Sequence, residues 1–167
     1  MSKQTQEALN HDGFGATLLA WWDDLEHDTG GRARLRRARQ VIDVVACPAY
    51  HRLLWDMQGL GRIDSRRLPL VAMAVSRVRR LTGHQSLGKT MARPREGGGN
   101  PRVSGLRFRR LIQIDDRQEL WAPMRRVLAL VDDTADPVSL ARDLYFWGPA
   151  VKIRWAEDYY STAKKAE

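Results

Sequence analysis

Apolar residues recur along most of this chain at the three- and four-residue spacing of amphipathic helices. Such stripes are formed by Phe14, Leu18, Leu19, Trp22 and Leu25; by Leu35, Ala38, Ile42 and Val45; by Tyr50, Leu53, Leu54 and Met57; by Leu68, Val71, Val75, Val78 and Leu81; by Leu120, Met124, Val127, Leu128 and Val131; and by Val151, Trp155 and Tyr159. No segment alternates apolar and polar residues as a half-buried strand does. The pattern predicts an all-α fold of about eight helices.

Proline and acidic residues mark several helix starts. The residue before a proline avoids helical geometry, whereas proline suits a first helical turn, so Cys47-Pro48 ends one helix and begins the next. Asp136-Pro137 combines an N-cap residue with a proline in the first turn. Asp116 and Glu119 are spaced as a capping box. Pro123 lies inside the apolar pattern that follows, so that helix either kinks or restarts there.

The helical pattern is interrupted between residues 83 and 102, where glycine and proline concentrate around Gly97, Gly98 and Gly99. We therefore expect two small helical lobes, residues 1–92 and 103–167, joined by a flexible loop at 93–102.

Composition limits the classes of protein that need to be considered. The chain has 167 residues, 43% of them hydrophobic, which is enough for a real core. A single cysteine, Cys47, cannot form an internal disulfide or a paired-cysteine zinc or redox site. The apolar stretch Phe14–Trp22 is short and is followed by acidic residues, unlike a secretory signal, and nothing approaches the ~20 apolar residues of a membrane helix. These features favour a cytoplasmic protein without a membrane segment.

Positive charge is concentrated in the middle of the chain. Residues 31–110 contain nineteen Lys/Arg and four Asp/Glu, a net charge of +15, between flanks of −5 (1–30) and −2 (111–167). Such a segment attracts polyanions. Lys89 is its only lysine. The other cations are arginines, whose planar guanidinium binds phosphate oxygens in pairs. A solvated charged surface is the alternative interpretation.

One short string matches the phosphate-binding loop of nucleotide hydrolases: Gly83, four free positions, then Gly88-Lys89-Thr90. That loop works between a buried strand and a helix that begins at the lysine. Here a helical stripe precedes Gly83, and Pro94 follows too soon for a long helix. The string "LALVDD" (128–133), which resembles a magnesium-binding strand, reads as the end of a helix. We therefore expect no nucleotide hydrolysis.

No other catalytic or metal chemistry is indicated, and no cofactor is expected. The four histidines lack ligand spacing, and the paired carboxylates, such as Asp132-Asp133, resemble helix ends. The six tryptophans mostly fall on apolar stripes, which favours core packing over stacking on bases.

Arginines form ladders at helical spacing. Arg32, Arg36 and Arg39 would share one helix face and Arg34 and Arg37 another; Arg77 and Arg80 lie one turn apart, as do Arg107 and Arg110. Ladders of this kind follow a phosphate backbone, and such contacts position nucleic acid without reading its sequence.

Six stretches, in this order, resemble the small subunit of the type I-E CRISPR surveillance complex, Cascade, known as the CasB family. They are "LRRARQVIDVVACPAYHRLL" (35–54), "SLGKTMA" (86–92), "RFRRLI" (107–112), "MRRVLALV" (124–131), "LARDLYFWG" (140–148) and "RWAEDYY" (154–160). The glycine-rich insertion at Gly97–Gly99 departs from the family pattern.

The resemblance implies a non-enzymatic helical protein that is present as two copies. Family members contact the sugar-phosphate backbones of the guide RNA and the target DNA and help to hold the separated DNA strands. They also contact the large subunit and the subunits that form the backbone of the complex. Arg36 and Arg37 match a family basic pair, and Lys89 follows the family's Ser-Leu-Gly motif. The family pattern also has basic positions at Arg107, Arg125, Arg126 and Arg142, and a generally basic region at Lys152 and Arg154.

The predicted nucleic-acid contacts are therefore Arg34, Arg36, Arg37, Lys89, Arg107, Arg110, Arg125, Arg126, Arg142 and Lys152. For Arg125, Arg126 and Arg142, surface salt bridges with neighbouring aspartates are the alternative. The alternative function is a free-standing helical DNA- or RNA-binding regulator, with the arginine-rich helix expected over 31–45 as its reader. No tight helix-turn-helix spacing accompanies that segment. Pairing with a guide supplies specificity in guided systems, so a basic surface that ignores sequence suits the first function.

Overall fold

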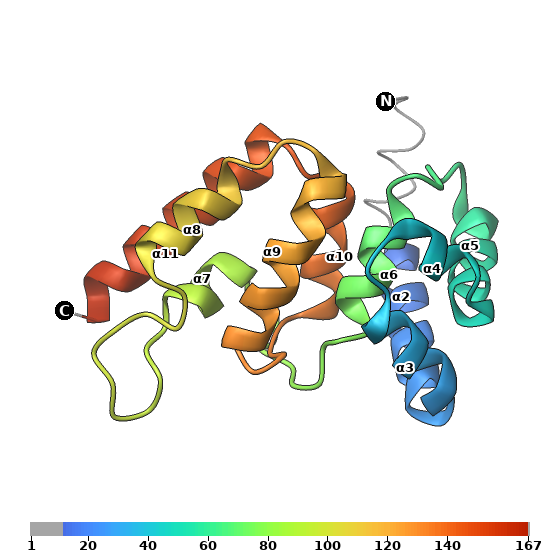
Figure 1. The fold of residues 1–167 in the computed structure, drawn as a ribbon, viewed down its shortest axis with the longest axis horizontal. Helices are drawn as coiled ribbons and strands as arrows, with labels where there is room; N and C mark the ends of the chain where they lie inside the picture. The colour runs from blue at the N-terminus through green and yellow to red at the C-terminus, as the bar shows by residue number, and fades with distance from the viewer. Residues whose placement is uncertain (1–11, 167) are drawn as a thin grey trace. The chain divides into compact units, whose positions relative to one another are not determined.

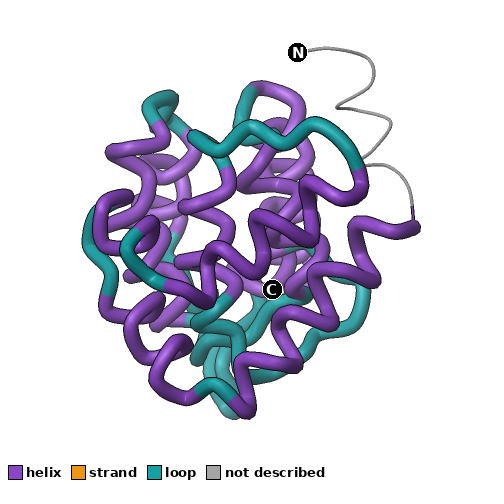
Figure 2. The backbone as a smooth tube through the Cα atoms, turned by 90° about the vertical axis from the view of Figure 1, so that its right-hand side faces the viewer, coloured by secondary structure: helices purple, strands orange, loops and turns teal. Residues whose placement is uncertain are grey.

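A computed structural model describes residues 12–166 and contains ten α-helices in that range, with no strand among these residues (Figures 1 and 2). The helices are α2 (Asp12–His27), α3 (Thr29–Arg37), α4 (Val41–Val45), α5 (Pro48–Leu60), α6 (Leu68–Val75), α7 (Leu87–Ala92), α8 (Gly105–Ile112), α9 (Arg117–Leu130), α10 (Pro137–Tyr145) and α11 (Pro149–Ala166). The predicted all-α class is confirmed. Eight of these helices have eight or more residues, and only α4 and α7 are shorter.

The chain divides into two compact units, Met1–Arg77 and Val78–Glu167. The division lies earlier in the chain than the loop at 93–102, at which the sequence suggested that two lobes would meet. The physical reason is helix α7, which precedes that loop but packs along α11 near the C-terminus. The loop is thus a connection inside the second unit.

In the first unit, α6 is the central helix. Every one of its residues from Leu68 to Val75 is buried, and it contacts α3, α4 and α5. A helix that is apolar all round is stable only when it is covered on all sides. The arginine-bearing α3 thus rests on an apolar support.

In the second unit, the long helix α11 carries the buried rings of Trp155 and Tyr159. Helices α7 and α8 both lie beside α11 (Figure 1). Helix α8 contacts α11 through the stacked rings of Phe108 and Tyr159, whose centroids are 4.1 Å apart. Two helices that bear predicted binding residues are therefore held by the same aromatic core.

The predicted helix starts agree with the structure. Pro48 opens α5, and Pro137 opens α10 behind its N-cap Asp136, whose carboxylate accepts a hydrogen bond from Val138 N. Helix α9 runs through Pro123 without restarting. Asp116 caps α9 by accepting from Gln118 N at 2.8 Å, so it acts as a simple N-cap there.

The glycine-rich loop between α7 and α8 is closed at its base. Pro94 and Pro101 form an isolated antiparallel bridge, and Arg102 N donates to the carbonyl of Arg93 at 3.1 Å. Residues 95–100, beyond this base, are all exposed. The guanidinium groups of Arg95 and Arg102 contact the Asp132 carboxylate just after α9, at 3.9 and 3.4 Å. The loop is thus attached to the unit at its base while its tip is open to solvent.

Candidate nucleic-acid interface

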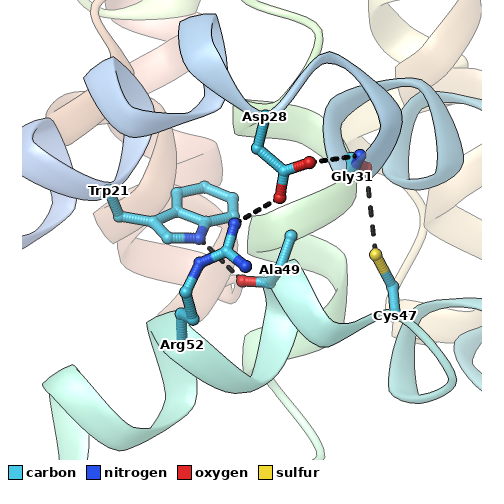
Figure 3. A network of polar contacts seen from close by, with 6 residues as sticks. All are labelled: Trp21, Asp28, Gly31, Cys47, Ala49 and Arg52. Carbon is cyan, nitrogen blue, oxygen red and sulfur yellow. Dashed lines mark hydrogen bonds and ion pairs between the residues drawn. The ribbon is translucent and has the colours of Figure 1, made fainter.

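Helix α3, which carries three of the predicted binding arginines, is fixed at its start by a polar network (Figure 3). Asp28 is the N-cap of α3, and its carboxylate accepts a hydrogen bond from Gly31 N at 2.8 Å. The same carboxylate pairs with the guanidinium of Arg52 on α5. On α2, the indole of Trp21 donates to the carbonyl of Ala49 at 2.8 Å. Both α2 and α3 are thereby tied to α5.

Close packing requires glycine at position 31. A Cβ there would overlap the carboxylate of Asp28 and lie 2.9 Å from the Cβ of Ala49. The buried Cys47 thiol donates to the Gly31 carbonyl, with sulfur and oxygen 3.8 Å apart (Figure 3). The hydrogen bonds from Arg52 and Gly31 hold the pKa of Asp28 below its usual value, so this cap is a stable anion.

The three predicted cations on α3 differ in exposure. Arg34 and Arg37 are exposed, whereas Arg36 is partly buried and takes part in an interaction within the fold. Leu35 between them is fully buried, which fixes the orientation of the helix. The Nε atom of Arg37 donates to the carbonyl of Ala33 at 3.1 Å. Because a guanidinium has five donors, this bond leaves most of them for another partner.

The single arginine-rich helix expected over 31–45 is wrong. The chain leaves helical geometry after Arg37, and α4 begins at Val41, where the Asp43 carboxylate accepts hydrogen bonds from the N–H groups of Arg39 and Gln40. The break changes the helical phase, so Ile42 is 63% exposed and Val44 occupies the buried position instead.

The expected face shared by Arg32, Arg36 and Arg39 does not form, because Arg39 lies in the break. Arg32 serves the fold: its Nε donates to the carbonyl of Ser76 at 3.1 Å, and its guanidinium pairs with Glu26. The basic surface of this helix is therefore narrower than the spacing suggested.

Helix α8 carries a compact group of exposed arginines. Arg107, Arg109 and Arg110 are all exposed, and none of them makes an ion pair with any residue in the described range 12–166. Phe108 and Leu111 on the opposite side are buried and hold the helix in place. Arg109 was not among the predicted contacts, because it does not lie one turn from either of its arginine neighbours. The sequence feature that could have identified Arg109 is the string "RFRR", in which three arginines fall within four residues.

The predicted cations on α9 and α10 behave differently. Arg125 is half-buried and Arg126 is exposed, and within the described part of the chain neither forms the salt bridge considered as the alternative. Arg142 on α10 is half-buried and interacts within the fold. Because α8 contacts α9, the arginines of these two helices belong to neighbouring elements of one unit.

The two predicted lysines are engaged in ion pairs. Lys89 on α7 lies 3.7 Å from the Asp158 carboxylate on α11. Lys152 on α11 is 2.5 Å from Asp115, and its ammonium lies 5.6 Å from the centroid of the Trp147 ring. The charge of each lysine is therefore already partly balanced by a carboxylate within the fold.

The apparent phosphate loop is a helix-packing motif. Ser86 caps α7 and donates from its hydroxyl to Asp158 at 2.5 Å, so a carboxylate of the chain already occupies this helix end. Thr90 and Gly88 are buried, and α7 has only six residues. No strand precedes it within the described residues, as the sequence predicted.

The string "LALVDD" (128–133), which resembles a magnesium-binding strand in sequence, also has a structural role. Helix α9 ends at Leu130, and the following Asp132 and Asp133 have positive φ angles of 56° and 54°. Asp132 binds the two arginines of the glycine-rich loop. Among residues 12–166, no group of three or more His, Cys, Asp or Glu side chains is placed to hold a metal ion.

The core role expected for the tryptophans is right for four of them and wrong for Trp55. Trp21, Trp121, Trp147 and Trp155 are buried, whereas Trp55 on α5 is 64% exposed.

None of the described helices has the length and apolar character that crossing a membrane requires.

Comparison with known families decides what the chain is related to. The sequence profile of the CRISPR-associated protein Cse2 family matches residues 31–160, which include every predicted contact. The chain belongs to the Cse2 family. Cse2 proteins, also called CasB, are non-catalytic small subunits of type I-E Cascade, so the predicted absence of enzymatic activity is confirmed.

Solved structures agree with membership of the Cse2 family. A chain in the crystal structure of Escherichia coli Cascade bound to a PAM-containing double-stranded DNA target is similar over 92% of this chain and 97% of its own length, with 26% identity and a TM-score of 0.69. CasB from Thermus thermophilus is similar in fold over 88% of this chain and 97% of its own, with 23% identity and a TM-score of 0.64. No curated protein gives a significant match by sequence.

Proposed function

We propose that this Cse2-family chain holds guide RNA and target DNA within a Cascade complex through contacts of its arginines with phosphates. The family supports the setting, because the Escherichia coli complex that contains a similar chain is bound to a double-stranded DNA target. The contacts would position the nucleic acid and leave its sequence to be read by pairing with the guide.

The observation that carries this proposal is the state of the arginines on α8. Arg107, Arg109 and Arg110 are exposed, lie within four residues and have no carboxylate partner in the described structure. A protein gains nothing for its own stability by placing three like charges next to each other. The arrangement is favourable when phosphates supply the missing negative charge.

The remaining predicted residues would contribute according to their present partners. Arg34 and Arg37 on α3 and Arg126 on α9 are exposed and can reach a phosphate directly. Arg36, Arg125 and Arg142 are half-buried and would present only part of the guanidinium. Lys89 and Lys152 would contribute least, because Asp158 and Asp115 already bind them.

Within the complex we propose that this surface also holds the DNA strands once the target has paired with the guide. The other expected partners are a second copy of this chain and the large and backbone subunits. Membership of the Cse2 family argues against the alternative of a free-standing regulator, as does the broken helix at 38–40, which shortens the segment that would have read bases.

The test is the salt dependence of binding by the isolated protein. Replacing Arg107 and Arg110 with alanine should weaken binding to single-stranded and duplex DNA and lower the salt slope by about 0.7–0.9 for each phosphate that is no longer bound. The matched control is Lys164→Ala with Lys165→Ala, which removes two exposed charges from the end of α11. Equal effects of the two double variants would mean that net charge alone attracts DNA, and would contradict a site on α8.

A further inference from the structure

Helices α8 and α11 lie side by side (Figure 1), and aromatic side chains of both helices form one cluster. The buried rings of Phe108 and Tyr159 stack 4.1 Å apart with an interplanar angle of 5°. The ring of Tyr160 stands nearly perpendicular to both, with centroids 5.9 Å from Phe108 and 5.2 Å from Tyr159. Tyr160 is nevertheless 48% exposed. Two ring contacts thus hold Tyr160 in place while leaving a large part of it open to solvent.

One arginine of α8, Arg109, acts on this cluster. Burial raises the pKa of the Tyr159 hydroxyl, and the positive charge of Arg109 opposes that rise. The charge of Arg109 therefore acts on the same aromatic cluster that positions Tyr160.

An open aromatic ring beside unpaired guanidinium groups has the chemistry that binds unpaired nucleotides. A base stacks on the ring, while a nearby guanidinium binds an adjoining phosphate. In a duplex the faces of the bases are covered by their neighbours, so the ring would find no partner there. A ring that neighbouring side chains already hold also loses little conformational entropy when a base stacks on it.

We propose that Tyr160 and Arg109 form a site for unpaired nucleotides, in which a base stacks on Tyr160 while Arg109 binds an adjoining phosphate. The inference rests on the proposed function and adds to it a preference of this surface for single strands. Trp55 is more exposed, but the arginine that lines its groove, Arg52, is bound to Asp28. The pairing of an open ring with free cations therefore favours α8.

The experiment measures binding to three ligands of equal length: oligothymidylate, the same backbone with abasic sites, and a duplex. Tyr160→Ala should weaken oligothymidylate binding by about 5- to 150-fold, the effect of removing one base–aromatic stack, without changing the salt slope. Tyr160→Phe should bind within about twofold of the wild type, because stacking needs the ring and not the hydroxyl. The matched control is Ile153→Ala, which removes another exposed apolar side chain of α11 and should change nothing.

The abasic ligand provides a test that does not depend on the folding of a variant. The wild type should bind it as weakly as Tyr160→Ala binds oligothymidylate, and Tyr160→Ala should lower abasic binding no further. Unchanged oligothymidylate binding by Tyr160→Ala, or equal reductions for all three ligands, would overturn the stacking role.

The arginines separate failure of this inference from failure of the proposed function. If Arg107→Ala with Arg110→Ala weakens binding to all three ligands while Tyr160→Ala has no effect, only stacking is overturned. If neither variant changes binding, the proposed phosphate contacts on α8 fail as well. A wild type that binds none of the three ligands but binds a protein partner through this face would overturn both.

Discussion

Gly88 on α7 lies against the backbone of Trp155 on α11. A Cβ added to Gly88 would come within 2.7 Å of the Trp155 carbonyl oxygen and 3.1 Å of its Cα. Neither contact is with a flexible side chain that could move away. The glycine of the Ser-Leu-Gly motif is therefore needed for two helices to approach closely, not for a nucleotide to approach the backbone.

We predict that Gly88→Ala destabilises the protein by about 1–3 kcal/mol, the usual effect of overpacking. Alanine favours helices more than glycine does, so intrinsic propensity alone predicts the opposite sign. The matched control is Gly59→Ala on α5, where an added Cβ meets nothing within 4 Å. That change should be neutral or stabilise by about 0.4–1 kcal/mol. Urea unfolding of both variants checks the pair, and a Gly88→Ala protein as stable as the wild type would contradict the packing role.

The same geometry predicts that nucleotides do not bind at Lys89. Its ammonium lies beside Asp158, and the Ser86 hydroxyl donates to the same carboxylate. An anionic phosphate would have to displace that carboxylate without the backbone cradle of a true phosphate loop. Thermal unfolding should therefore be unchanged by Mg-ATP, in the wild type and in Lys89→Ala alike. An upward shift of the wild type that Lys89→Ala abolishes would refute this.

Most of the fold could be predicted from the sequence because the signals were local. Caps such as Asp136 and prolines such as Pro48 act on their own helix turn, and apolar periodicity reports burial directly. The break at residues 38–40 was not predicted, because the apolar stripe continues across it. A local hydrogen bond from the N–H of Gln40 to Asp43 starts a new helix there instead. The boundary between the compact units was not predicted, because it depends on the contact between α7 and α11, which are far apart in sequence.

The basic surface was only partly predictable for a related reason. Spacing shows which arginines share a helix but not which carboxylates the fold brings to them. Lys152 forms an ion pair with Asp115, whereas Arg126 forms none with any carboxylate among residues 12–166. The spacing does distinguish two of the tryptophans: the buried Trp155 lies on an apolar stripe, whereas the exposed Trp55 lies off the stripe of its helix.

The glycine-rich loop should be the first site of proteolysis. Residues 95–100 are exposed, while the base is held by the Pro94–Pro101 bridge and by Asp132. Such a loop opens locally at little cost. Brief trypsin treatment should cleave after Arg95, and Asp132→Ala should be cleaved faster because both ion pairs are removed. Primary cleavage within α5, at residues 48–57, would contradict this expectation.

Acid should weaken the anchor of α3. The Arg52 guanidinium and the Gly31 N–H lower the pKa of Asp28 below its ordinary value of 3.8, so its ionised form stabilises the fold above that pH. This contribution is lost as the pH falls through the lower pKa of the folded state. Asparagine still caps a helix, so Asp28→Asn removes mainly the charge.

We therefore predict that the stability difference between the wild type and Asp28→Asn shrinks as the pH falls from about 5 to about 3. Burial raises the pKa of Asp143, which changes stability in the opposite direction, but both proteins share that group and the difference cancels it. Thermal unfolding across this range provides the comparison. A difference that is constant with pH would mean that Asp28 acts without its charge.

The central claim is that the arginines hold phosphates without reading bases. The most direct measurement is the affinity of the wild type and of Arg36→Ala with Arg37→Ala for several unrelated oligonucleotides of equal length across a salt series. We predict closely similar affinities and salt slopes for all sequences in the wild type, and a uniform reduction with a flatter slope in the variant while helix content persists. A reduction confined to one sequence would contradict backbone binding and favour a base-reading regulator. Normal binding by a variant that unfolds at lower temperature would show instead that Arg36 and Arg37 serve the fold.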